Sequence, residues 1–227
     1  MNTEAIFSNH GTDYPYTYEY VDYLTKKGFN IRTVYPEVRD RQGNTWSNLY
    51  DYCYDKKIVP SRRFRWCTDK FKIQPVLKSI QKPCTIYIGF DKGELHRISK
   101  IKIHGVQYEY PLLNHQISRE KCKELILDAG LIVPEKSCCF ICPFCSKREV
   151  RRMQNNYPDQ FEKLMALEEN CMRKDLTYFE RSLRSISGKD SQKISAWIWI
   201  IIDKKWENSF FIWFYYDDLF HCKQIIT

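Results

Sequence analysis

The chain has 227 residues, of which 43% are hydrophobic and 15% aromatic, enough to bury the core of one ordinary domain. A net charge of +8 favours a phosphorylated or nucleic-acid partner. The first residues lack the basic and apolar regions of a signal peptide, and no apolar run approaches the roughly 20 residues of a membrane span. We therefore expect a cytoplasmic protein that uses no membrane and whose cysteines serve metal or redox chemistry.

The first 35 residues predict the strand–helix–strand unit of a parallel sheet. A short apolar run at residues 4–8 predicts a buried strand that runs into a turn at 9–12. Pro15 then opens a helix that Gly28 ends, and residues 30–35 alternate like a second strand. Because a strand stands at the very start, we expect the front end of the sheet to be absent. Neither a Walker A loop nor G-x-G-x-x-G occurs in the chain.

Residues 43–57 are expected to form a helix framed by loops. The segment 60–75 then interleaves basic and aromatic residues, a pattern that can clamp phosphates and stack a base. Thr68 is expected to cap a helix over residues 70–80. A generic basic surface helix stays open as the alternative.

A strand is predicted at residues 85–90, and the polar stretch Asp91–Arg97 follows its carboxyl end. Open α/β sheets bind ligands at such ends, although an ordinary polar turn is the alternative. Ser118 is expected to cap a helix that Gly130 ends. Another helix is expected over 157–172, and the aromatic-rich runs 194–202 and 210–216 are read as a helix and a strand. The inner side of the helix at 157–172 is expected to carry Phe161, Leu164, Met165 and Leu167.

The segment 138–145 holds four of the ten cysteines. Cys139, Cys142 and Cys145 form a C-x2-C-x2-C run, with Cys138 as a spare. Gaps of two residues let turns aim successive thiolates at one point, which a metal or a cluster requires. Buried or disulfide-bonded cysteines are the alternative. A basic run follows, which would stabilise thiolates or receive an anion: Lys147, Arg148, Arg151 and Arg152.

Four segments together resemble the phosphoadenosine-phosphosulfate (PAPS) reductase family of the PP-loop ATP pyrophosphatases. The chain is most similar to uncharacterised bacterial and phage members and to DNA-phosphorothioation relatives. Residues 10–19 look like the family's T-G-x-E-x-P-x-T-Y region, and 134–148 look like its cysteine box. Residues 65–75 and 88–97 complete the likeness, which covers roughly residues 5–180.

The resemblance implies a three-layer Rossmann-like (adenine nucleotide alpha hydrolase-like) α/β fold with a parallel sheet that lacks its N-terminal part and a helical cysteine-box region. It implies a nucleotide-binding domain over 1–181 and an atypical extension over 182–227. Members bind ATP or an adenylyl-sulfate nucleotide and carry out sulfur or adenylyl transfer. Some members hold a [4Fe-4S] cluster, whose ligands here would be Cys67, Cys139, Cys142 and Cys145. A zinc site using Cys138 or Cys139 with Cys142 and Cys145 is the second choice.

The resemblance also implies a nucleotide site, while the catalytic residues stay unknown. Arg62, Arg65 and Lys70 would hold phosphate with support from Arg97, which Glu94 would orient. Gly11 and Thr12 would line the pocket through their backbone, and Asp91 belongs to the same set.

The chain departs from the family in two places. The S-G-G-x-D-S loop is missing from the front, and the related string Ser187–Ser191 suggests either a chance likeness or a circular permutation. Cys222 lacks the context of the family's C-terminal cysteine, so reductase activity itself stays open. One alternative function is a non-catalytic, cluster- or zinc-bearing module that binds nucleic acid or a protein partner. A defective fragment with unpaired strand edges is a third.

Overall fold

A computed structural model of the chain describes residues 3–62, 64–98, 102–171 and 200–203. Its strands are β1 (Glu4–Ser8), β2 (Ile31–Val34), β3 (Val38–Arg39), β4 (Thr45–Trp46), β5 (Cys84–Ile88), β6 (Val106–Glu109) and β7 (Ile200–Asp203). Its α-helices are α1 (Pro15–Lys26), α2 (Leu49–Lys56), α3 (Trp66–Thr68), α4 (Gln74–Ser79), α5 (Pro111–Asn114), α6 (Arg119–Asp128), α7 (Lys147–Asn156) and α8 (Pro158–Cys171). A π-helix, η1 (Asp69–Ile73), joins α3 to α4, and a 3-10 helix, η2 (Lys92–Arg97), follows β5.

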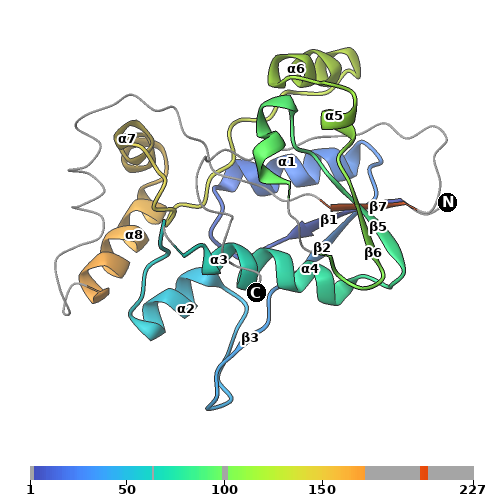
Figure 1. Ribbon diagram of the computed structural model, residues 1–227. Coiled ribbons are helices and arrows are strands. Elements are labelled where there is room, and N and C mark those ends of the chain that lie inside the picture. The colour runs from blue at the N-terminus through green and yellow to red at the C-terminus, as the bar shows by residue number, and fades with distance from the viewer. Residues whose placement is uncertain (1–2, 63, 99–101, 172–199, 204–227) are drawn as a thin grey trace.

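The fold is α/β, and its main sheet has the strand order β2-β1-β7-β5-β6 (Figure 1). β1 pairs in parallel with β2, and β5 pairs in parallel with β6. The central strand β7 runs antiparallel to both β1 and β5, so the prediction of a wholly parallel sheet is wrong at this strand. β7 also begins inside a run that was expected to be helical. The other residues of 182–227, Ser187–Ser191 and Cys222 included, lie outside the described residues.

Neighbouring residues of β1 point to opposite faces of the sheet, and each of the two faces packs against a helix there. Phe7 packs with Val21 of α1 on one face. Ile6 packs on the other face in a cluster that we call the sheet core, in which α4 takes part (Figure 1). The sheet core consists of Ile6, Val34, Val76, Ile80 and Ile86.

Local signals set several of the element ends. Pro15 stands at the first position of α1, and Gly28, just past its end, has φ of +93°. The Ser118 side chain accepts a hydrogen bond from the Lys121 backbone N–H, which confirms the predicted cap of α6. The predicted cap at Thr68 is wrong, because Thr68 lies inside a helical stretch and its side chain makes no capping bond. Helical backbone begins at Trp66 and continues through η1.

A second cluster, which we call the box core, lies to one side of the sheet, where α2, α7 and α8 meet the cysteine segment (Figure 1). It is rich in rings and sulfur where the sheet core is aliphatic. Leu164 and Leu167 of α8 point into it as predicted, whereas Met165 is 48% exposed and does not belong to the inner side. The buried members are Tyr14, Leu49, Cys53, Phe71, Cys138, Phe140, Ile141, Cys145, Met153, Leu164 and Leu167.

Candidate functional site

The cysteine segment folds as two successive turns. The backbone N–H of Cys142 donates to the carbonyl of Cys139 at 3.0 Å, and that of Cys145 donates to the carbonyl of Cys142 at 3.1 Å. Phe140 and Ile141 are buried and anchor the first turn in the box core. The spacing of two residues therefore turns the chain once per cysteine, as the sequence pattern predicts.

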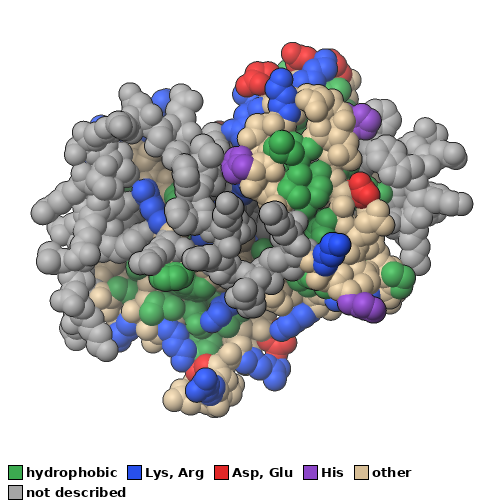
Figure 2. Space-filling view, in the orientation of Figure 1, with side chains coloured by type: hydrophobic (Ala, Val, Ile, Leu, Met, Phe, Trp, Pro, Cys, Tyr) green, Lys and Arg blue, Asp and Glu red, His purple; other side chains and the backbone are tan. Residues whose placement is uncertain are grey.

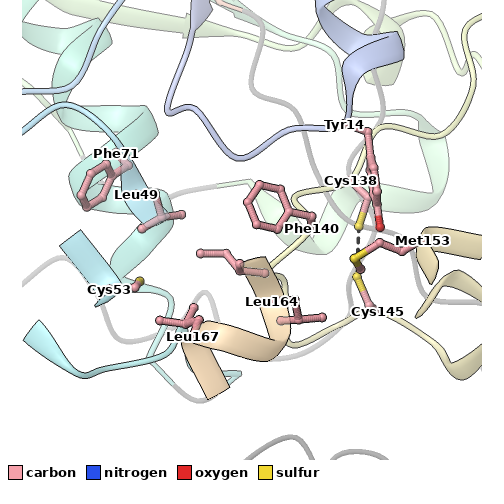
Figure 3. Packing of buried hydrophobic residues seen from close by; sticks show 11 residues of the cluster. Tyr14, Leu49, Cys53, Phe71, Cys138, Phe140, Cys145, Met153, Leu164 and Leu167 are labelled. Atoms are coloured by element: carbon pink, nitrogen blue, oxygen red, sulfur yellow. Dashed lines mark hydrogen bonds between the residues drawn. The ribbon is translucent and has the colours of Figure 1, made fainter. Parts of the chain in front are cut away.

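The Cys138 thiol lies close to two other thiols of this segment. The Sγ atoms of Cys138 and Cys145 lie 3.3 Å apart, beside Met153 and Tyr14 (Figure 3). Cys138 also shares a hydrogen bond with Cys142, and this bond followed by burial raises the pKa of the Cys142 thiol well above its ordinary value. Cys138, which the sequence offers only as an alternative ligand, is thus the member that touches both Cys142 and Cys145.

Cys139 faces a different set of partners. Its Sγ lies 3.0 Å from the hydroxyl of Thr12, in the loop after β1. Backbone pairing fixes this approach: Phe140 N–H donates to the Thr12 carbonyl at 2.9 Å, and Tyr14 N–H donates to the Cys138 carbonyl at 3.3 Å. Burial raises the pKa of Cys139 well above its ordinary value.

Cys67, distant in sequence, packs against the same cluster. Burial and then the nearby Cys142 thiol raise the pKa of Cys67. Burial, followed by the nearby Cys139 and Cys67 thiols, raises the pKa of Cys53 in α2, a residue that sequence reasoning missed. Its position on the inner face of a short helix is the signal that could have found it.

The chemistry of these side chains fits a soft metal, because thiolate ligands prefer zinc and iron–sulfur clusters. A metal must first displace the thiol protons, since the raised pKa values keep the sulfurs protonated at neutral pH. Throughout the described part of the chain, however, no group of three or more His, Cys, Asp or Glu side chains is arranged to hold a metal ion.

Two of the predicted phosphate ligands lie against the cysteine segment. Arg62 Nε donates to the Pro143 carbonyl at 2.7 Å. The guanidinium carbons of Arg62 and Arg65 lie 5.3 and 5.4 Å from the centre of the Phe144 ring. Lys70 lies apart from this pair, with Nζ 3.4 Å from the Tyr52 hydroxyl.

Lys72 is a cation that sequence reasoning did not select. Its charge acts to lower the pKa values of Cys67, Cys139 and Cys142. It stands in η1, and π-helical turns occur frequently at functional sites. That turn was not visible in the sequence, which gave no signal for Lys72 beyond its basic neighbourhood.

The remaining predicted residues follow β1 and β5. Gly11, with φ of +76°, lies so close to Asn48 that an added Cβ would meet its side chain at 2.3 Å. Asp91 accepts from Gly93 N–H at 2.7 Å, and Glu94 accepts from Asp91 N–H at 3.1 Å while pairing with Arg97. β1 and β5 both run antiparallel to β7, so Gly11 and Asp91 stand at the same edge of the sheet. The predicted nucleotide residues that follow β1 and those that follow β5 therefore lie at the same edge of the sheet.

No helix within the described residues is long and apolar enough to cross a membrane. On the face shown in Figure 2, lysine and arginine side chains are spread along the lower part, beside exposed hydrophobic side chains.

Two curated proteins of Methanocaldococcus jannaschii are similar to the chain. The uncharacterized protein MJ0066 is 24% identical over 179 residues, which is 70% of this chain and 35% of that protein. The uncharacterized protein MJ0973 is 22% identical over 182 residues, which is 70% of this chain and 40% of that protein. The chain thus spans well under half the length of these relatives. No protein-family model matches the chain. No solved structure matches it either.

Proposed function

We propose that this chain is a PAPS reductase-like protein of the PP-loop superfamily with a three-layer, Rossmann-like nucleotide-binding fold. It binds ATP or an adenylyl-sulfate nucleotide at the edge of the sheet where β1 and β5 end. Its chemistry is sulfur or adenylyl transfer, beside a thiolate-bound centre that is a [4Fe-4S] cluster in the first instance and zinc in the second.

One observation carries the proposal: three of the four segments that bear the family resemblance, at 10–19, 65–75 and 134–148, pack against one another. The loop after β1 pairs with the cysteine segment, and Cys67 of the basic segment lies near Cys142. Parallel pairing of β1 with β2 and of β5 with β6 supports the nucleotide-binding sheet. When bound, a metal centre would hold the two segments together through thiolates from both, and a cluster would add electron transfer.

Equilibrium binding of ATP and of an adenylyl-sulfate nucleotide to the full chain tests the nucleotide part. We expect Arg65→Gln to weaken binding about tenfold or more, because it removes a charge-assisted contact to phosphate. Arg41→Gln, an exposed arginine in the β3–β4 turn, serves as the matched control. Lack of binding at millimolar concentrations of either nucleotide would remove this part of the proposal.

Iron, zinc and sulfide analysis of anaerobically purified protein tests the centre. Cys67→Ala is expected to lower metal occupancy, because it removes the ligand from the distant segment. Cys138→Ser and Cys139→Ser, compared side by side, identify which neighbour is the ligand. Full occupancy in the Cys67 variant would exclude Cys67 from the ligand set.

A second candidate is a non-catalytic module that binds single-stranded nucleic acid. Arg62 and Arg65 lie over the Phe144 ring, and the Phe64 side chain next to them is 57% exposed. Basic groups interleaved with aromatic rings bind nucleic-acid backbones and stack bases. Steep salt dependence of oligonucleotide binding, reduced by Arg62→Ala with Arg65→Ala and unaccompanied by nucleotide turnover, would favour this function.

A further inference from the structure

A chain of buried polar side chains ends at the sulfur of Cys139. The Thr12 hydroxyl lies 3.0 Å from Cys139 Sγ and 2.6 Å from His10 Nδ1. On the far side of the imidazole, His10 Nε2 lies 3.2 Å from Asp13 Oδ1. His10 and Thr12 are fully buried, and Asp13 is nearly so. Two close polar contacts of Thr12 and one close approach of the imidazole to a carboxylate therefore follow one another inside the protein.

The Thr12 hydroxyl carries a single hydrogen, which it can donate either to Nδ1 of His10 or, when Cys139 is ionised, to the Cys139 sulfur. The Thr12 hydroxyl is thereby fixed between an imidazole nitrogen and a sulfur. Its rotation is restricted at both ends, which holds the sulfur at a defined distance from the loop after β1.

Burying a histidine and a carboxylate costs free energy that simple packing would not require. The box core next to these residues is otherwise built of rings, aliphatic side chains and sulfur. Proteins accept the free-energy cost of burying polar groups when those groups orient a side chain that binds metal. Within the described residues, Thr12 contacts the Cys139 thiol, whereas Cys138 lies close to Cys142 and Cys145.

We propose that Thr12, oriented by His10 and Asp13, is a positioning residue that sets the place and hydrogen bonding of the Cys139 sulfur. The inference rests on the proposed thiolate-bound centre in one respect: a metal held by Cys139 takes its ligand geometry from Thr12. Thr12 then acts on the centre through its side chain.

The test compares Thr12→Val, which removes the hydroxyl at nearly constant shape, with Thr12→Ser, which keeps it. Co²⁺ alone is added to the metal-free full chain, and the sulfur-to-cobalt charge-transfer band is recorded. We expect Thr12→Val to bind Co²⁺ roughly 10- to 100-fold more weakly and to shift the band, while Thr12→Ser stays near wild type. Thr17→Val is the matched control, since Thr17 is also buried and its hydroxyl has no hydrogen-bond partner among the described residues.

A second readout needs no metal. Alkylation of the metal-free chain is followed by mass spectrometry, peptide by peptide. Thr12→Val is expected to slow alkylation at Cys139 several-fold while Cys142 keeps its wild-type rate, because the Cys139 thiolate alone loses a hydrogen-bond donor.

The two readouts separate the proposals. A wild-type chain that binds neither Co²⁺ nor iron removes the proposed centre, while the alkylation comparison still decides whether Thr12 controls Cys139. Identical behaviour of Thr12→Val and Thr12→Ser in both readouts overturns the role of Thr12 and leaves the proposed centre standing. A band shift in Thr17→Val as large as that in Thr12→Val also overturns it.

Discussion

The sheet core and the box core lie side by side but are held together by different chemistry. The sheet core contains only aliphatic side chains, whose contribution depends on the area that they bury. The box core contains Cys138 and Cys145 in mutual contact, and a sulfur changes its charge and its partners when it is protonated, oxidised or bound to metal. The stability of the first core is therefore fixed by packing, and that of the second depends on the state of its thiols.

The largest expected effect comes from the sheet core. Ile86 is fully buried there, so Ile86→Ala should lower the free energy of unfolding by about 2–5 kcal/mol. Denaturant unfolding with and without a chelator measures this loss, which should be the same in both conditions. Leu127→Ala, at a side chain that is 61% exposed, is the control and should change stability by less than about 0.5 kcal/mol. A loss at Ile86 that depended on chelator would break the comparison.

Removal of metal should affect the box core selectively. If the proposed centre ties Cys67 to the cysteine segment, chelation should raise hydrogen exchange at the amides of 138–156 about tenfold or more. Amides of β1 and β5 should stay protected, because their hydrogen bonds lie in the sheet. Equal deprotection of both regions would mean that the two cores open as one unit.

A smaller effect is expected at the start of α7. The Ser146 side chain accepts from the Glu149 backbone N–H, and Glu149 accepts in return from the Ser146 N–H, so Ser146→Ala should cost about 1 kcal/mol. Ser118→Ala, at the cap of α6, should cost a similar amount. Only the Ser146 variant should also weaken metal retention, because α7 follows Cys145 directly. Equal metal content in both variants would contradict that link.

The smallest effect concerns Glu4 of β1, whose carboxylate accepts two hydrogen bonds from Arg32 of β2. These bonds hold the pKa of Glu4 below its ordinary value of 4.5. The pair therefore stabilises the protein above the unfolded pKa, and the contribution is lost as the pH falls through the folded value. Since both side chains are partly exposed, Glu4→Gln should cost less than about 1 kcal/mol at pH 7 and nothing at low pH. Urea midpoints at pH 7 and below pH 3 check this, and an equal loss at both would contradict it.

Several helix ends and turns could be predicted from the sequence, because their signals are local. Pro15 and Gly28 bound α1, Ser118 caps α6, and the two-residue gaps between cysteines produce turns. Thr68 shows where local signals fail: it has the chemistry of a cap, but the chain around Phe71 is already helical and adds a π-turn.

The details of the site could not be predicted, because they depend on contacts between distant segments. Pairing of Asp13 with Cys139 decides which of two adjacent cysteines meets Thr12 and which meets Cys145. No spacing rule distinguishes Cys138 from Cys139 in advance. Likewise, Lys72 acts on the thiols from within the π-helix η1, a turn for which the sequence has no signal.

The position of β7 has a consequence for synthesis on the ribosome. Ile200–Asp203 completes the sheet between β1 and β5, yet it is made roughly a hundred residues after β5. At about 5–20 residues per second, the inner edge of β5 waits roughly 5–20 s for its partner, and that of β1 waits roughly 10–40 s. During that interval the nascent chain exposes two unpaired strand edges, to which a chaperone can bind before the chain leaves the ribosome.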